Sequence, residues 1–178
     1  DEDREAKRRL DEAVKESRDR LEEIRKEVEK MVRENEELNR RNEEEIRKAV
    51  EELRELLRRQ KLPEDVVRKI EKIVEDNRES VKRNVDESRK IVKELRDLLK
   101  KLFEESEETV RELEDRLRKR GVDRDVLREI EEELTKDRKR VKEVLEELRR
   151  IAKRLKERDE ESHERNRRSL DKLKKEVK

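Results

Sequence analysis

The residues of this chain that suggest chemistry most directly are Asp159 and His163. They are four positions apart, so a helix would place a carboxylate and an imidazole on one face, where both could bind a metal ion. However, His163 is the only histidine among 178 residues, and the chain has no cysteine. The polar residues expected beside the pair are asparagines, whose amide oxygens are poor ligands for the metals that imidazole binds. We therefore interpret the pair as structural and expect no metal site.

Ser17, Ser106 and Asp137 form a second candidate group, with the hydroxyls and the carboxylate of a nucleophilic site. A nucleophilic hydroxyl needs a base that removes its proton, and this group contains no histidine. Asp137 and Asp159 could also serve as general acids, but a narrow helical core offers no evident substrate cavity. Glycine-rich phosphate loops are absent, since the chain has a single glycine. The sequence therefore predicts no catalytic residue, no cofactor and no enzyme activity.

The composition agrees with a helical protein that carries its charges on the surface. Charged residues make up 62% of the chain and hydrophobic residues 28%, with 56 basic and 55 acidic side chains. So much charge is typical of disorder, but here the apolar residues keep a helical period. Because both signs are interleaved along the chain, no face is basic enough for nucleic acid. No apolar run is long enough to cross a membrane, so we expect a soluble chain.

The elements that must position the polar residues are specified by apolar residues that recur every eighteen positions. Eighteen residues make five turns of an α-helix at about 3.6 residues per turn, so an apolar stripe stays on one face. A heptad repeat would drift and impose a left-handed supercoil. We therefore expect straight, nearly parallel helices. The repeat is seen in Leu10, Val28 and Ile46, in Val74, Val92 and Val110, and in Leu134, Ala152 and Leu170.

The single proline and the single glycine mark the places where this pattern is interrupted. Pro63 suits the first turn of a helix, where its missing N–H is not needed. Gly121 suits a left-handed helix C-cap, and Asp123 then suits the N-cap of the next helix. The predicted helices span about residues 2–60, 63–119 and 124–177, with turns at 61–63 and 120–123, in one domain over residues 1–178.

Two short turns make neighbouring helices antiparallel. The predicted fold class is therefore all-α, a long, nearly straight antiparallel three-helix bundle (up-down-up) with an 18-residue core repeat. Residues at the same height in an antiparallel pair have a constant sum of residue numbers. That sum is 123 for Met31 with Val92 and 243 for Val92 with Ile151, and half of each sum falls in a predicted turn. The layers are the same for either handedness of the third helix.

The same two sums align the polar residues that interrupt the apolar stripes. A buried amide or hydroxyl without a partner costs roughly 1 to 3 kcal/mol, whereas an aligned layer can match donors with acceptors. A shifted helix would set these groups against hydrocarbon, so the layers specify the register. We expect the longest polar stretch to be the weakest part of the bundle, and acid to weaken it further. The predicted layers are Ser17, Ser106 and Asp137; Asn35 and Ser88; Asn39, Asn84 and Asp159; Asn42, Ser80, Ser162 and His163; Asn77 and Asn166.

The eighteen-residue repeat, the Glu/Lys/Arg surface, the Leu-Pro-Glu-Asp and Gly-Val-Asp turns and the layered Asn, Ser and His residues resemble computationally designed helical bundles with buried hydrogen-bond networks. The resemblance covers the whole chain and is specific as a style of sequence. It implies an idealised, very stable single-chain scaffold with no evolved activity. The first residue is not methionine, which we interpret as the removal of a tag or leader. Spectrin-like three-helix repeats differ, since their core stripes carry aromatic residues and this chain has no tryptophan.

Two hypotheses about function remain. In the first, the chain is a monomeric scaffold that requires no partner. In the second, it is an interaction module in which a fourth helix or a second copy of the chain completes the polar layers. The molar mass in solution distinguishes the two hypotheses, because a monomer at high concentration excludes most forms of the second.

Overall fold

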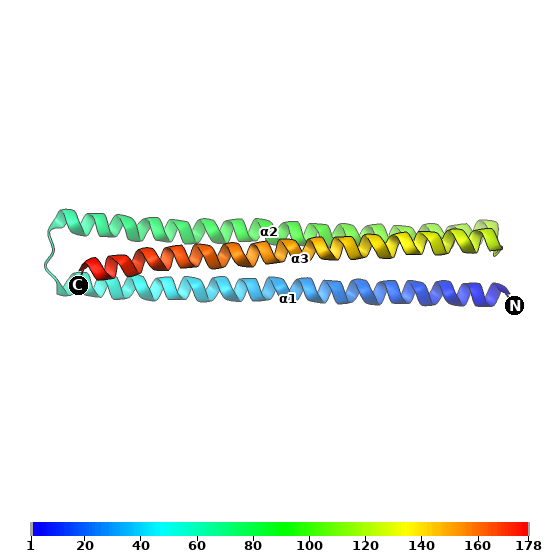
Figure 1. Cartoon of the computed structure of the whole chain (residues 1–178), viewed down its shortest axis with the longest axis horizontal. Coiled ribbons are helices and arrows are strands. Elements are labelled where there is room, and N and C mark those ends of the chain that lie inside the picture. The colour runs from blue at the N-terminus through cyan, green and yellow to red at the C-terminus, as the bar shows by residue number, and fades with distance from the viewer. Residues whose placement is uncertain (1, 178) are drawn as a thin grey trace. The chain divides into compact units, whose positions relative to one another are not determined.

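A computed structural model describes residues 2–177, with side chains from Arg4 onward; Asp1 and Lys178 lie outside the described residues. The described chain is 96% helical and contains no strand. Three helices follow one another, α1 (Glu2–Arg59), α2 (Glu64–Arg120) and α3 (Arg124–Val177) (Figure 1). They pack against one another, which confirms the predicted all-α three-helix bundle.

The connection between α1 and α2 differs from the prediction by one residue on each side. α1 ends at Arg59 and α2 begins at Glu64. Pro63 is therefore the N-cap residue and not part of the first turn, and its carbonyl oxygen accepts the N–H of Val67 at 3.1 Å. Proline fits this position because no helical hydrogen bond requires its missing N–H.

The connection between α2 and α3 has the predicted caps. Gly121 has φ 73°, and its N–H donates to the carbonyl oxygen of Leu117 at 3.0 Å, as in a left-handed C-cap. Asp123 Oδ1 accepts the N–H of Val126 at 2.8 Å, which satisfies one free donor at the start of α3. The predicted end of α2 at residue 119 is one residue short, because the helix continues to Arg120.

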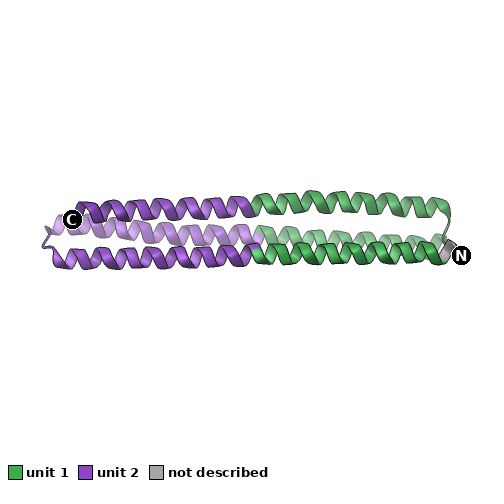
Figure 2. Ribbon diagram, turned by 60° about the horizontal axis from the view of Figure 1, so that its bottom comes forward, with its two compact units in different colours: residues 1–30, 94–151 green, residues 31–93, 152–178 purple. Residues whose placement is uncertain are grey.

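The chain divides into two compact units, and each contains one part of each helix (Figure 2). Unit 1 consists of residues 1–30 and 94–151, and unit 2 of residues 31–93 and 152–178. We describe the two units separately. The single domain over residues 1–178 stays a prediction.

The core of unit 1 contains an apolar layer of Leu10, Leu113 and Ile130, one residue from each helix, and their residue numbers give the predicted sums of 123 and 243. All three are buried in one cluster with Val14 and Val126. Burying a valine, leucine or isoleucine side chain contributes about 1.5 to 3 kcal/mol, so a layer of this kind holds its three helices together.

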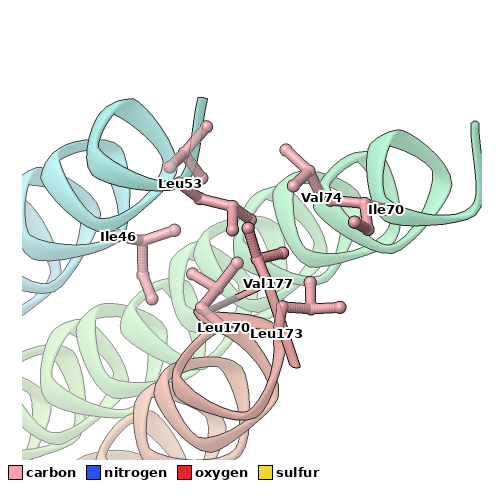
Figure 3. Close-up of a cluster of buried hydrophobic side chains, with 8 residues drawn as sticks. Ile46, Leu53, Ile70, Val74, Leu170, Leu173 and Val177 are labelled. Atoms are coloured by element: carbon pink, nitrogen blue, oxygen red, sulfur yellow. The ribbon is translucent and has the colours of Figure 1, made fainter. Parts of the chain in front are cut away.

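The core of unit 2 contains the corresponding layer of Leu53, Ile70 and Leu173. Figure 3 shows side chains from all three helices meeting in this cluster. Its buried members are Ile46, Val50, Leu53, Ile70, Val74, Leu170, Leu173 and Val177. The apolar stripes of the three helices therefore converge here as the sequence predicts.

Polar pairs confirm the register of α2 and α3 within each unit. In unit 1 Ser106 Oγ is 3.3 Å from Asp137 Oδ1, and in unit 2 Asn84 Nδ2 is 3.0 Å from Asp159 Oδ1. Both pairs of residue numbers add up to the predicted 243. The two helices are therefore antiparallel in each unit.

Surface ion pairs give the register of α1 and α3. Arg149 Nε lies 2.9 Å from Glu27 Oε1 in unit 1, and Arg167 Nη1 lies 3.2 Å from Glu45 Oε2 in unit 2. Residue numbers differ by 122 in both pairs. The predicted sums imply parallel helices with a difference of 120, so the side chains meet within two residues of the expected height.

We expect Gly121→Ala to lower the free energy of unfolding by about 1 kcal/mol, because a Cβ at positive φ is strained. No atom lies within 4 Å of the position that this Cβ would occupy, so backbone strain is the only source of the loss. Gly121→Asn is the control and should lose less, since asparagine tolerates this conformation. Urea titration measures both values. An unchanged stability for the alanine variant would contradict the C-cap.

Candidate functional site

The most deeply buried polar group of unit 2 is the carboxyl of Asp159 on α3, which has 0% solvent exposure. Its Oδ1 accepts a hydrogen bond from Ser88 Oγ at 2.6 Å and one from Asn84 Nδ2 at 3.0 Å, both on α2. Asn39 on α1 also hydrogen-bonds to this carboxyl. The predicted layer of Asn39, Asn84 and Asp159 is thus brought together. Three helices contribute to one polar cluster, which we call the Asp159 cluster.

Ser88 belongs to the Asp159 cluster and not to a separate layer with Asn35, where the sequence placed it. Side chains on a helix lean toward its N-terminus. Because α2 and α3 are antiparallel, Ser88 and Asp159 lean toward each other across one helical turn. Asn35 is buried, and its Oδ1 has no hydrogen-bond partner in the protein.

Burial raises the pKa of the Asp159 carboxyl above its ordinary value of 3.8. Hydrogen bonds from Ser88, Asn84 and Asn39 and the nearby charge of Arg158 oppose this effect without cancelling it. The charge of Arg158 is shared with Glu87, whose Oε2 lies 3.7 Å from Arg158 Nη1. For Asp159 the expectation that acid weakens the polar stretch is therefore reversed, since protonation of this carboxyl favours the folded state.

His163 pairs with a residue that the sequence did not single out. Its Nε2 lies 2.8 Å from Glu45 Oε2 on α1, and Arg167 Nη1 lies 3.2 Å from the same oxygen. The i, i+4 spacing of His163 and Asp159 does place both on the lining of one small cavity. Among residues 2–177, no group of three or more His, Cys, Asp or Glu side chains is arranged to hold a metal ion.

Asn77 takes a different partner from the predicted Asn166. Its Nδ2 donates to the carbonyl oxygen of Ile73 at 2.8 Å and to Ser169 Oγ at 3.2 Å. Asn77 and Asn166 are both buried, but the side chain of Asn77 reaches back along α2 and therefore meets a later residue of α3. The remaining predicted residues have these positions: Ser162 is buried, and Asn42 and Ser80 are half-buried.

The second buried carboxyl is that of Asp137 in unit 1, and it pairs with the guanidinium of Arg140. Its Oδ1 accepts a hydrogen bond from Ser106 Oγ at 3.3 Å and one from Arg140 Nη2 at 2.6 Å. Arg140 Nη1 also lies 2.9 Å from Glu105 Oε2 at the edge of the bundle. Ser17 is half-buried and lines a pocket with Ser106, but the structure gives it no hydrogen bond to this group. Arg140 therefore takes the place that the sequence assigned to Ser17.

The sequence could have pointed to Arg140 through its spacing. Arg140 follows Asp137 by three positions, so the two side chains lie on neighbouring turns of one helix face. The half-buried position of Arg140 allows its guanidinium to reach inward to Asp137 and outward to Glu105.

Unit 1 also contains a groove of about 400 Å³ between α1 and α3, lined by apolar side chains and by charged ones such as Arg9 and Glu131. Ala6 and Ala13 line one wall, and Leu127 and Leu134 line the other. The two alanines leave space that longer side chains would fill. Such a groove was not expected, but the residues that line it include no histidine and no hydroxyl nucleophile, so it lacks the groups of a hydrolytic site.

Comparisons with models of protein families, with curated proteins and with solved structures find no match to this chain. Over residues 2–177, none of the three helices is long and apolar enough to cross a membrane. The function must therefore be argued from the polar clusters, the groove and the charged surface.

The raised pKa of Asp159 leads to a pH prediction. The carboxyl binds protons more tightly in the folded than in the unfolded chain, so its stabilising effect is complete below the unfolded value near 3.8 and is lost as pH rises through the folded pKa. A tenfold difference in proton affinity corresponds to about 1.4 kcal/mol. We expect Asp159→Asn to gain stability relative to the native chain as pH rises from about 4 to 8.

Urea titration of both proteins across this pH range measures the effect, and the difference between them isolates Asp159 from other titrating groups. Asp86→Asn is the matched control, because Asp86 is exposed on α2. A difference between the native chain and Asp159→Asn that stays constant with pH would contradict the assignment.

The two serines of unit 1 should respond differently to the same substitution. Ser106→Ala removes a hydroxyl that donates to Asp137 and accepts from Arg140, so we expect a loss of about 1 kcal/mol. Ser17→Ala should change the free energy of unfolding by less than about 0.5 kcal/mol. Guanidinium titration checks both values, and equal losses would place Ser17 in the same network.

Proposed function

We propose that this chain is a structural scaffold of the computationally designed helical-bundle class and that it has no enzymatic activity. The observation that supports this proposal is the Asp159 cluster, in which α1 and α2 supply hydrogen-bond donors to a carboxyl of α3 with 0% exposure. The cluster is surrounded by apolar layers that repeat every eighteen residues. Such regularity serves the fold itself, because Ser88 and Asn84 of α2 pair with Asp159 of α3.

The proposed role of the Asp159 cluster is to select one register of the helices. A shift of α2 by one turn would separate either Ser88 or Asn84 from Asp159 Oδ1, because the two residues lie about one turn apart on α2. Each polar group then left buried without a partner would cost roughly 1 to 3 kcal/mol, whereas a matched hydrogen bond contributes only about 1 kcal/mol. The cluster therefore destabilises a shifted register by more than it stabilises the correct register.

The charged surface supports the same proposal. Inter-helix ion pairs such as Lys174 with Glu52, at 2.5 Å, lie on the outside of unit 2, and the hydrogen bond from Lys174 lowers the pKa of the Glu52 carboxyl. Exposed ion pairs contribute little stability, commonly below about 1 kcal/mol. Their opposite signs can still favour this pairing of helices over others.

A second candidate function, an interaction module, is favoured by the groove of unit 1. A groove of about 400 Å³ walled by Ala6, Ala13, Leu127 and Leu134 could receive apolar side chains of a fourth helix or of a second copy. This candidate requires association in solution, whereas the scaffold does not.

Light scattering coupled to size-exclusion chromatography tests the scaffold proposal. We expect the native chain to be a monomer at all concentrations up to the millimolar range, with one cooperative thermal transition. We expect a variant with Asn84→Leu, Ser88→Ala and Asp159→Leu to remain helical and at least as stable, because the carboxyl and both of its hydrogen-bond donors on α2 are removed together. This variant should also form dimers or larger species, since its apolar stripes no longer distinguish partners.

The control carries three exposed substitutions in the same helices, Arg83→Ala, Asp86→Ala and Glu160→Ala, and should remain monomeric. A native chain that dimerises would favour the interaction module. If the variant without the cluster stayed monomeric with one set of amide resonances, the apolar repeat and the turns alone would specify the register.

A further inference from the structure

A small cavity in unit 2 separates the Asp159 cluster from the pair formed by His163 and Glu45. Its volume is about 10 Å³, and α1, α2 and α3 all contribute to its lining. Asn42, Asp159 and His163 are among the residues that line it. Two buried atoms of these residues, Asp159 Oδ2 and His163 Nδ1, have no hydrogen-bond partner in the protein. A buried polar atom without a hydrogen-bond partner lowers the stability of the folded chain, so we expect both atoms to have a partner.

The hydrogen bonds around the cavity specify what kind of partner is required. His163 Nε2 lies 2.8 Å from the carboxylate oxygen Oε2 of Glu45, so the ring proton is placed on Nε2, which donates to Glu45. Nδ1 of a neutral imidazole then carries a lone pair and must accept. Oδ2 of an ionised Asp159 also accepts. Two acceptors on one cavity require a molecule that offers two donors.

The size of the cavity restricts the molecule further. A volume of about 10 to 15 Å³ is the least that holds one water molecule, and a buried water makes two to four hydrogen bonds. A cavity of about 10 Å³ therefore has room for one water and for no larger ligand. A metal ion is disfavoured, since beyond Asp159 and His163 the lining offers amides, a hydroxyl and the exposed Glu43, and among residues 2–177 no group of three or more His, Cys, Asp or Glu side chains is arranged to hold one.

We propose that this cavity is a binding site for a single water molecule, which donates one hydrogen to Asp159 Oδ2 and the other to His163 Nδ1. The amide of Asn42, also on the lining, is the donor available to the oxygen of this water. When the carboxyl of Asp159 is protonated, the same water accepts its O–H and still donates to Nδ1.

The water would join two groups of residues that the direct contacts leave separate. Ser88 and Asn84 reach Asp159 from α2, and Glu45 reaches His163 from α1. A bridge between Asp159 and His163 makes them one hydrogen-bond network across all three helices. It also explains why His163 occupies this position, since its ring can accept at Nδ1 while it donates at Nε2.

Magnetic relaxation dispersion of water oxygen-17 tests the proposal, because it counts waters that stay bound far longer than surface waters. We expect His163→Leu to lose one long-lived water per protein relative to the native chain. Asp137→Asn in unit 1 is the control and should lose none. An unchanged count in His163→Leu, with circular dichroism like that of the native chain, would overturn the proposal.

Nitrogen-15 chemical shifts of the His163 imidazole provide a second measurement. It is made on the native chain and therefore needs no variant. We expect the proton on Nε2 and an accepting Nδ1, with water-to-amide cross-relaxation at the side chain of Asn42. A proton on Nδ1 would overturn the proposal. A stoichiometric shift of Nδ1 on addition of Zn²⁺ alone would also overturn it, because the site would then take a cation.

Discussion

The constraint on which the rest of this structure depends is that polar side chains are buried in a narrow apolar core. Each of them needs a hydrogen-bond partner there, because bulk water cannot supply one. Asp159 has 0% exposure, so it must find hydrogen-bond donors on other helices or lose stability. Ser88 and Asn84 supply them from α2. Both donors contact the carboxyl together in this register, and a shift of α2 by one turn would remove one of them. We propose that the polar cluster adds to the specificity of register that the apolar repeat and the turns provide.

The two buried carboxyls are stabilised in different ways. Asp137 accepts a hydrogen bond from the guanidinium of Arg140, which lies half-buried at the edge of unit 1. Asp159 has only neutral donors in contact, and burial raises its pKa. The two carboxyls differ because of where they lie in the core. The guanidinium of Arg140 can reach Asp137 while its charge stays near solvent, whereas no guanidinium of the described residues contacts Asp159 in this way. The stability of unit 2 therefore depends on the protonation of Asp159.

The direction of side chains explains where the observed partners differ from the predicted ones. Constant sums of residue numbers describe Cα heights, but side chains lean toward the N-terminus of their own helix. Each side chain therefore reaches the height of a residue with a lower number than its own. As a result, two side chains that meet across an antiparallel pair come from residues whose numbers add up to more than the sum for Cα atoms at equal height. Asn77 with Ser169 adds up to 246 and Ser88 with Asp159 to 247, above the predicted 243. The predicted layers were correct in height and neglected this lean.

By itself the sequence determined the three helices, their ends to within one residue and their register. These properties follow from local rules, because the eighteen-residue period, Pro63 and Gly121 act on the chain around them. Only the tertiary structure decided which partner each polar side chain takes. His163 pairs with Glu45, and Ser106 shares Asp137 with Arg140 and not with Ser17. The reason is that such contacts depend on the length and direction of side chains across a helix interface, which no periodicity along one helix contains.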